Sequence, residues 1–192
     1  MSEFLYSIDL SLFYAVNHSL SNPVFDWFMP FVTDLNRSKF VLWSVAAVLG
    51  WMLWKGEKNV KLAAIALIVT IVASDQFSSH VVKFWFERAR PCQSLADVFL
   101  RVGCGGGFSF PSSHAVNNFA GAIVLSFYIP RAAKWFYLFA ATVAFSRVYI
   151  GVHYPLDVLG GAVIGSAIGG TVLALFTIVE LRFFSSGHSQ RS

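Results

Sequence analysis

Long apolar stretches constrain this chain more than any other feature of its sequence. The last of them, from Leu156 to Glu180, has no charged side chain between Asp157 and Glu180. About 20 predominantly apolar residues are enough to cross a bilayer as an α-helix. The sequence therefore predicts an all-α fold, a polytopic transmembrane helical bundle. Small residues recur every four positions in the last span, which favours close helix packing: Gly161, Gly165 and Gly169. Five spans are expected, at about 38–54, 62–82, 113–130, 134–150 and 156–180.

The composition supports a membrane protein. Hydrophobic residues make up 56% of the chain and charged residues 12%, whereas soluble domains carry about 25% charged residues. The mean hydropathy is +0.63. The net charge of +4 is not gathered into a basic stripe or helix, so no nucleic-acid partner is expected. A length of 192 residues predicts one domain over residues 1–192.

The two ends of the chain differ from the apolar middle. Residues 1–36 are apolar but interrupted by polar side chains, a pattern typical of amphipathic helices at a membrane interface or on the outside of a bundle. They could also supply a sixth span. Glu3 and Asp9, with no basic region before them, argue against a signal peptide. Residues 185–192 are expected to form a polar tail.

Three polar clusters interrupt the apolar chain. With five spans, parity places all three on the same face of the membrane. Charged side chains at such a boundary are costly, and they commonly mark a functional site. Together the clusters contain lysine, arginine, histidine, serine and aspartate. They lie at Lys83–Pro91, Phe110–His114 and Ser146–Asp157.

These residue types suit phosphoryl transfer. Lysine and arginine bind phosphate oxygens, and arginine can bind two at once. Ser112, Ser113 and the N–H groups at the start of the third span would add donors, assisted by the helix dipole. One histidine can attack phosphorus while another protonates the leaving oxygen. An aspartate beside the attacking histidine would fix its tautomer.

The three clusters resemble the tripartite signature of the type 2 phosphatidic acid phosphatase (PAP2) superfamily, written K-x6-R-P, P-S-G-H and S-R-x5-H-x3-D. The order and the internal spacings match throughout. One departure is Ser113, where the family pattern has glycine, and this difference bears on fine specificity rather than on activity. The motifs read Lys83 through Arg90-Pro91, Pro111-Ser112-Ser113-His114, and Ser146-Arg147 through His153 to Asp157.

The resemblance implies a role for each matching residue. His153 would be the nucleophile that forms a phosphohistidine, and Asp157 the partner that orients it. His114 would protonate the leaving group and then activate water. The family's mechanism uses no metal, so a metal-independent phosphatase is expected, with no cofactor. The implied phosphate ligands are Lys83, Arg90, Ser112, Ser113 and Arg147.

The resemblance also implies the class of substrate. A membrane enzyme of this family would remove phosphate from a lipid head group, and its partners would be that lipid phosphate and the bilayer. The expected substrates are phosphatidylglycerol phosphate, phosphatidic acid or a lipid A phosphate. Undecaprenyl pyrophosphate is an alternative substrate of the same family. A non-catalytic lipid-binding scaffold is the alternative from another class of protein.

Charges and cysteines bear on the sidedness of the site. Lys and Arg are equally numerous on the two sides, but setting aside Lys83, Arg90 and Arg147 as site residues makes the side of the C-terminus cytoplasmic. Cys92 and Cys104 lie in one loop on the other side, where a disulfide would fit an oxidising compartment; two free thiols are the alternative. The site is therefore expected to face the periplasm, or the outside, of a bacterial inner membrane.

Simpler interpretations compete with the catalytic one. His153 and Asp157 could form an interfacial capping pair, or join His114 in a zinc site, although the surrounding cations argue against a bound metal cation. An intramembrane charge can also serve a helix–helix hydrogen bond. Four polar residues have no assigned chemistry: Asp75 and His80 in the second span, and Arg88 and Arg101, interpreted as loop charges near the head group.

Overall fold

The computed structural model describes residues 3–35 and 38–184. All regular structure in these two ranges is helical, which confirms the all-α prediction. The elements are α1 (Glu3–Tyr14), η1 (Ala15–Ser19), α2 (Pro23–Thr33), α3 (Lys39–Lys55), α4 (Lys58–Phe77), η3 (Ser78–Val82), α5 (Lys83–Phe86), α6 (Pro91–Ser94), α7 (Ser113–Tyr128), η4 (Pro130–Ala132), α8 (Ala133–Tyr149) and α9 (Pro155–Phe184).

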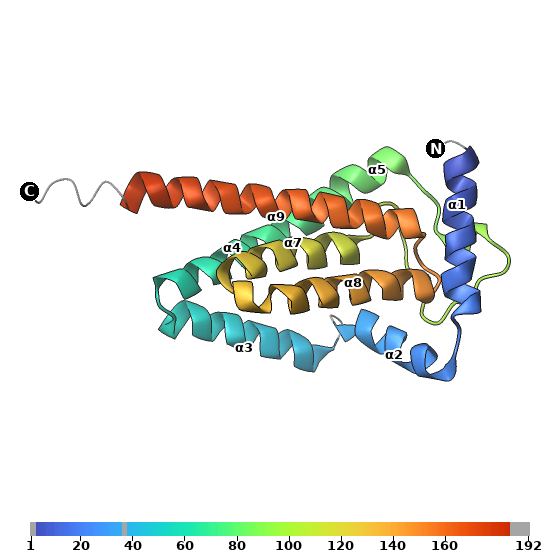
Figure 1. Ribbon diagram of the computed structural model, residues 1–192, viewed down its shortest axis with the longest axis horizontal. Helices are drawn as coiled ribbons and strands as arrows, with labels where there is room; N and C mark the ends of the chain where they lie inside the picture. Colours follow the sequence, from blue (N-terminus) through green and yellow to red (C-terminus); the bar gives the residue numbers. More distant parts are fainter. Residues whose placement is uncertain (1–2, 36–37, 185–192) are drawn as a thin grey trace, which may run out of the picture.

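The long helices run side by side, with α7 at the centre (Figure 1). Helices α4, α8 and α9 all pack against α7, and α3 packs on α4. The buried positions of α7 carry only small or β-branched residues, so its neighbours can approach closely. They are Ala115, Val116, Ala120, Gly121, Ala122 and Val124.

Glycines form the contact between α7 and α9. A Cβ atom on Gly165 would overlap the carbonyl group of Val116, and one on Gly169 would lie 2.7 Å from the carbonyl oxygen of Ala120. Any side chain at these positions would push the two backbones apart. The sequence pattern of small residues therefore corresponds to a backbone-to-backbone contact.

The outer surface of the bundle is apolar. Helix α3 has no buried residue, and the side chains of Trp43 and Trp54 are 76% and 75% exposed. Such a surface requires an apolar surrounding. Within the described residues, two stretches are long and apolar enough to cross a membrane by length and composition, Lys58–Ser94 and Pro155–Arg182.

The spans predicted at 62–82 and 113–130 leave residues 83–112 as a loop, but part of this stretch is helical in the structure. Helix α4 continues through η3 into α5 and ends only at Phe86. Lys83 therefore lies on a helix rather than in a loop. A further short helix, α6, begins at Pro91, the residue after Arg90. The polar connection is thus shorter than the sequence suggested, and its first basic residue has a fixed backbone.

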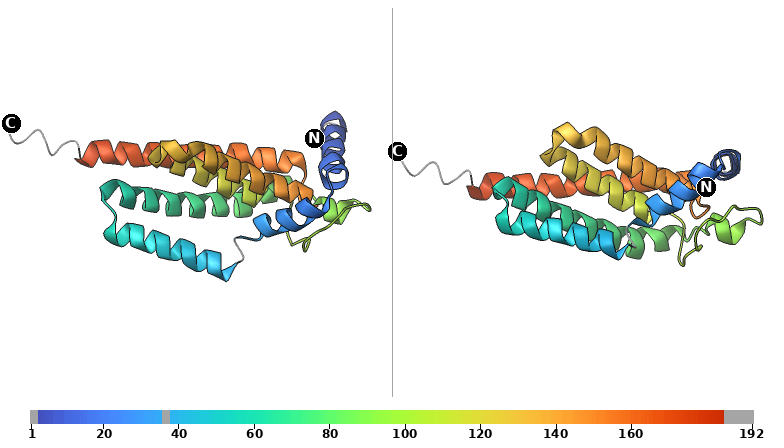
Figure 2. Two further views of the ribbon diagram at one scale, coloured as in Figure 1. Left: turned by 60° about the horizontal axis from the view of Figure 1, so that its bottom comes forward. Right: turned by 90° about the horizontal axis from the view of Figure 1, so that it is seen from below.

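Residues 3–33 close one end of the bundle. Helix α1 runs across the ends of the long helices rather than beside them (Figures 1 and 2). The side chain of Asn22 caps α2 by accepting hydrogen bonds from the N–H groups of Val24 and Phe25. The α3–α4 and α7–α8 connections and the C-terminal end of α9 lie at the opposite end of the bundle (Figure 1).

Candidate active site

His153 and Asp157 lie where the chain turns from α8 into α9. Pro155 is the first residue of α9, and Asp157 lies in its first turn. The two side chains are only 2% and 0% exposed. His153 Nδ1 is 3.5 Å from Asp157 Oδ2, and the same oxygen accepts a 2.8 Å hydrogen bond from the N–H of Tyr154. The carboxylate is therefore held behind the imidazole ring.

The partners of His153 define its tautomer. Arg90 Nη1 lies 3.1 Å from His153 Nε2, and because a guanidinium can only donate, Nε2 must accept. The ring proton then resides on Nδ1, facing Asp157. Burial lowers the pKa of His153 to about 4; Asp157 opposes this shift, while the charges of Arg90 and Arg147 add to it. The ring is therefore neutral near pH 7, with its lone pair on Nε2.

Arg90 is held by backbone carbonyl groups of the loop that follows it and of the turn between α8 and α9. Its Nε donates to Gly107 at 3.1 Å, and its Nη1 donates to Val152 at 3.1 Å. The loop is closed by a disulfide between Cys92 and Cys104. These acceptors orient the guanidinium toward His153 without neutralising its charge, so the charge remains available to an anion.

Two further cations belong to the same region. Arg147, in the last turn of α8, is 8% exposed and donates to the hydroxyl of Thr33 at 2.5 Å. Its carbonyl oxygen accepts hydrogen bonds of 3.2 Å from the N–H groups of Val152 and His153. Lys83 lies within electrostatic range of Arg90 and Arg147. Arg90 and Arg147 thus lie close enough to the imidazole for their charges to act on it, and Lys83 lies near both of them.

The N-terminus of α7 abuts that of α9. The N–H of Ser112, the residue before α7, donates to the carbonyl of Asp157 at 3.0 Å. The hydroxyl oxygen of Ser112 is buried and has no hydrogen-bond partner among the described residues. Ser113 instead points toward η3, because its hydroxyl lies 3.4 Å from that of Ser78. His114 is in the first turn of α7. A free hydroxyl at a helix N-terminus suits a bound anion.

Asp9 and Arg88 extend the site in a way that the sequence did not predict. Arg88 donates to Asp157 Oδ1 at 2.7 Å and to Asp9 Oδ2 at 2.5 Å, and its guanidinium lies 4.0 Å from the ring centroid of Tyr154. Asp9 is 0% exposed, and its other oxygen accepts a 2.8 Å hydrogen bond from the N–H of Leu156. Arg88 is therefore part of the carboxylate network, not a peripheral loop charge.

Ser109 is a second residue that the sequence did not single out. Its hydroxyl donates to Asp157 Oδ2 and lies 3.4 Å from His153 Nδ1. For the contact between Asp9 and Arg88 the sequence did contain a signal, because a lone acidic residue in an apolar helix requires a partner. No comparable signal marked Ser109. Asp75, on α4, accepts a 3.2 Å hydrogen bond from Asn117 on α7, which is the helix–helix contact that was one of its two interpretations.

The residues required for a zinc site do not come together. Within residues 3–35 and 38–184, no three His, Cys, Asp or Glu side chains form a group that could hold a metal ion. The polar groups around His153 are instead mostly cationic donors. Such a donor set recognises an anion with several oxygens, such as a phosphate group.

Several known proteins are similar to this chain in sequence and in fold. The family model of the PAP2 superfamily matches residues 63–180. The lipid A 4'-phosphatase of Bacteroides thetaiotaomicron is 34% identical over 177 residues, covering 86% of this chain and 75% of that protein. The crystal structure of Aquifex aeolicus LpxE superposes with a TM-score of 0.71 at 29% identity, covering 91% of this chain and 99% of that one. The PAP2-type phosphatidylglycerolphosphate phosphatase from Bacillus subtilis gives 0.73 at 25% identity, covering 93% and 89%.

The chain belongs to the PAP2 superfamily. It is a phosphatase of the PAP2 type, and that family consists of metal-independent phosphomonoesterases. The relatives include enzymes named for different lipid phosphates, so family membership gives the reaction class and not the substrate.

Proposed function

We propose that this protein hydrolyses a phosphomonoester on a membrane lipid, with His153 as the nucleophile. One observation carries the proposal: the buried imidazole of His153 lies between Asp157, 3.5 Å from its Nδ1, and the guanidinium of Arg90, 3.1 Å from its Nε2. A phosphate group placed beside Arg90 would meet the lone pair of Nε2 directly.

The first half of the reaction forms a phosphohistidine. Phosphate oxygens draw the Arg90 guanidinium away from Nε2 of His153. This nitrogen then attacks phosphorus while the bond between phosphorus and the lipid oxygen breaks. His114 gives its proton to that oxygen as the lipid leaves. The phosphorylated ring is cationic, and the carboxylate of Asp157 stabilises it. Lys83, Arg90, Arg147 and the hydroxyl of Ser112 bind the phosphate oxygens.

The second half releases phosphate. His114, now neutral, takes a proton from water, and the oxygen of that water attacks phosphorus. The bond between phosphorus and Nε2 breaks, inorganic phosphate departs, and His153 is again neutral with its proton on Nδ1. His153 thus acts first as the nucleophile and then as the leaving group, and His114 acts first as the acid and then as the base.

The proposed placement in the membrane has five spans. They are α3, the continuous helix from α4 to α5, α7, α8 and α9, while α1 and α2 lie at the interface. Helix α3, with 17 residues, is about 26 Å long, close to the hydrocarbon thickness of about 30 Å. The disulfide between Cys92 and Cys104 supports an extracytoplasmic site with a cytoplasmic C-terminus.

The proposed substrate is a lipid A phosphate or a glycerophospholipid phosphate, reached laterally from the bilayer. Its support is the similarity to proteins named for those two substrates. Most of the described residues belong to the α-helices of the bundle. This architecture suits a substrate that never leaves the membrane.

The test is phosphate release from a panel of lipid phosphates in detergent. His153→Ala and His114→Ala are expected to lose nearly all activity, and His80→Ala, on the exposed part of η3, is the matched control. With an aryl phosphate whose leaving group needs no proton, His114→Ala is expected to accumulate an acid-labile, base-stable phosphoenzyme. Full activity in His153→Ala would overturn the mechanism. A wild type inactive on every lipid phosphate would favour the scaffold alternative.

A further inference from the structure

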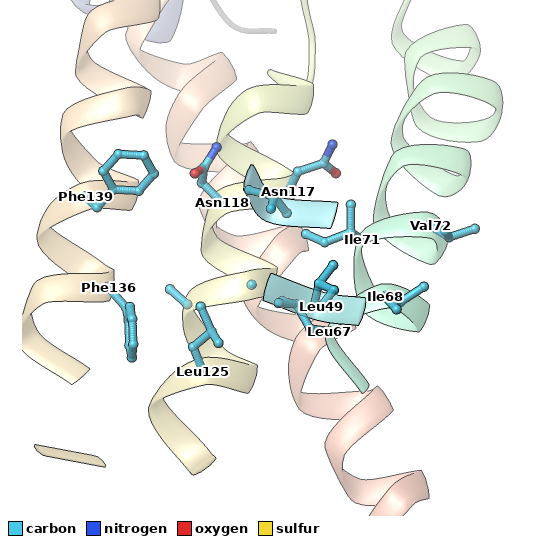
Figure 3. Close-up of a pocket in the computed structure, with 13 residues that line it drawn as sticks. Leu49, Leu67, Ile68, Ile71, Val72, Asn117, Asn118, Leu125, Phe136 and Phe139 are labelled. Carbon is cyan, nitrogen blue, oxygen red and sulfur yellow. The ribbon is translucent and has the colours of Figure 1, made fainter. Parts of the chain in front are cut away.

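An apolar groove lies among α3, α4, α7 and α8. It has a volume of about 380 Å³, within the range of ligand sites in proteins. Its walls are aliphatic and aromatic, and its polar lining residues are Asn117 and Asn118 (Figure 3). In Figure 3 these two lie at one end, with Leu125 and Phe136 toward the other. The groove therefore has a polar end and an apolar end.

The polar end faces the active site. Residues three, four, seven and eleven apart share one face of a helix, so His114 is aligned on α7 with Asn117, Asn118, Gly121 and Leu125. Asn118 donates to the carbonyl of His114 at 2.9 Å. At a rise of 1.5 Å per residue, Gly121 is about 10 Å and Leu125 about 16 Å below His114. That depth is about half of the hydrocarbon core.

We infer that this groove binds one acyl chain of the lipid whose oxygen His114 protonates. The inference rests on the proposed function and assigns the part of the substrate that the phosphate site does not touch. His114 must contact the oxygen that joins phosphate to lipid, so the lipid must extend away from His114. The groove begins one helical turn from that point and descends through one leaflet's depth.

The chemistry of the groove fits a linker followed by a chain. Asn117, fixed by its 3.2 Å hydrogen bond to Asp75, and Asn118 provide amide groups where an ester or amide linkage of the lipid would pass. Beyond them the walls offer only hydrocarbon. Val45 and Val72, on the rim, are 51% and 58% exposed, so the groove opens sideways and a chain can enter from the bilayer.

Gly121 is the position from which the groove can be blocked. A Cβ atom there would make ordinary contacts of 3.6 Å with Leu67 and Ile71, so alanine is accommodated and leucine would extend into the space for the chain. Gly170 on α9 is the matched control, because it is exposed and no described atom lies within 4 Å of a Cβ placed there.

The experiment compares Gly121→Leu with Gly170→Leu. The probes are dioleoyl and dihexanoyl phosphatidic acid, and p-nitrophenyl phosphate, which has no chain. Gly121→Leu is expected to raise KM about tenfold or more for the long-chain lipids. It should change kcat/KM less than about twofold for the short-chain and chainless probes. Gly170→Leu should match the wild type on all of them.

A second pair of variants keeps the inference testable if Gly121→Leu fails to fold. Val45 and Val48 lie on the same helix and are 51% and 56% exposed, but only Val45 lines the groove. Val45→Trp should reproduce the chain-dependent rise in KM, and Val48→Trp should not. An unchanged KM in Val45→Trp, or equal losses on long and short probes, would overturn the inference and mean that bulk lipid fills the groove. A wild type that releases phosphate from no probe would instead contradict the proposed function.

Discussion

The carboxylate of Asp9 and the guanidinium of Arg88 are joined by an ion pair of 2.5 Å. Asp9 is on α1 and Arg88 follows α5, so this contact ties the first helix of the chain to the site. Arg88 also forms an ion pair of 2.7 Å with Asp157, and Asp157 lies 3.5 Å from Nδ1 of His153. The first helix is therefore linked to His153, the proposed nucleophile, through two charged residues, Arg88 and Asp157.

Replacing Asp9 should lower turnover more than substrate binding. In Asp9→Asn, Arg88 keeps Asp157 as its charged partner among the residues that the structure describes, and it is expected to draw that carboxylate away from His153. We expect kcat to fall about ten- to a hundredfold with little change in KM. The measurement is steady-state phosphate release, with Asp9→Glu expected to recover part of the rate. Glu3→Gln, an exposed change on the same helix, is the control; a rise in KM at constant kcat would contradict the positioning role.

His153 should stay neutral well below the pH at which a free imidazole titrates. Its pKa falls from 6.5 to about 4, chiefly through burial. Nitrogen NMR of histidine-labelled protein in detergent should show a neutral ring with its proton on Nδ1 from pH 8 to about pH 5. The spectrum of His153→Gln assigns the signal. A midpoint near 6.5 would show that the ring is not desolvated.

The lowered pKa of His153 also makes the stability of the folded protein depend on pH. Between about pH 6.5 and pH 4 the unfolded chain binds a proton at His153 and the folded protein does not. Folding therefore loses stability from this group as the pH falls through that window, and the loss is complete below about pH 4. Thermal unfolding of His153→Gln should show a weaker dependence on pH in this window than the wild type.

Opening the disulfide should weaken phosphate binding. The bond between Cys92 and Cys104 closes the loop whose Gly107 carbonyl holds Arg90. In the Cys92→Ser, Cys104→Ser double variant we expect KM to rise and the free energy of unfolding to drop by about 2 to 4 kcal/mol. Phosphate release and thermal unfolding check these two effects. In whole cells an impermeant thiol reagent should label the wild type only after reduction, and labelling without reductant would contradict the bond.

The helix contact at Gly165 should not tolerate a side chain. A Cβ atom at this position would overlap the carbonyl of Val116 on α7, so even Gly165→Ala must separate α7 from α9. We expect a loss of about 1 to 3 kcal/mol and a lower melting temperature in detergent. Gly170→Ala, five residues further along α9, should melt with the wild type. Equal melting of the two variants would mean that the helices can shift apart at no cost.

The sequence was informative where a residue conflicts with its surroundings. Apolar runs indicated the helices, and charges inside such a chain marked Lys83, Arg90, Arg147, His153 and Asp157 as candidates. Those candidates are local in sequence, lie at fixed spacings and match a known pattern. The long helices and the reaction class could therefore be predicted from the chain alone.

The rest depends on how helices cross, which spacing does not encode. The contact between Asp9 and Arg88 joins residues 79 apart, and it exists only because α1 lies across the end of the bundle. Thr33 reaches Arg147 because the end of α2 packs against α8. Ser109 offered no signal, because a serine in a polar loop is unremarkable until a fold places it beside a buried carboxylate.

The hydrogen bond between Arg90 and Nε2 of His153 has a consequence for the idle enzyme. The reactive lone pair is already occupied, so reagents that attack imidazoles should meet a shielded atom. An anion with several oxygens can draw the guanidinium of Arg90 away from Nε2. An uncharged electrophile does not attract the guanidinium and leaves it in place. In the proposed mechanism, recognition of phosphate and unmasking of the nucleophile are then a single event, and the enzyme becomes reactive only toward what it binds.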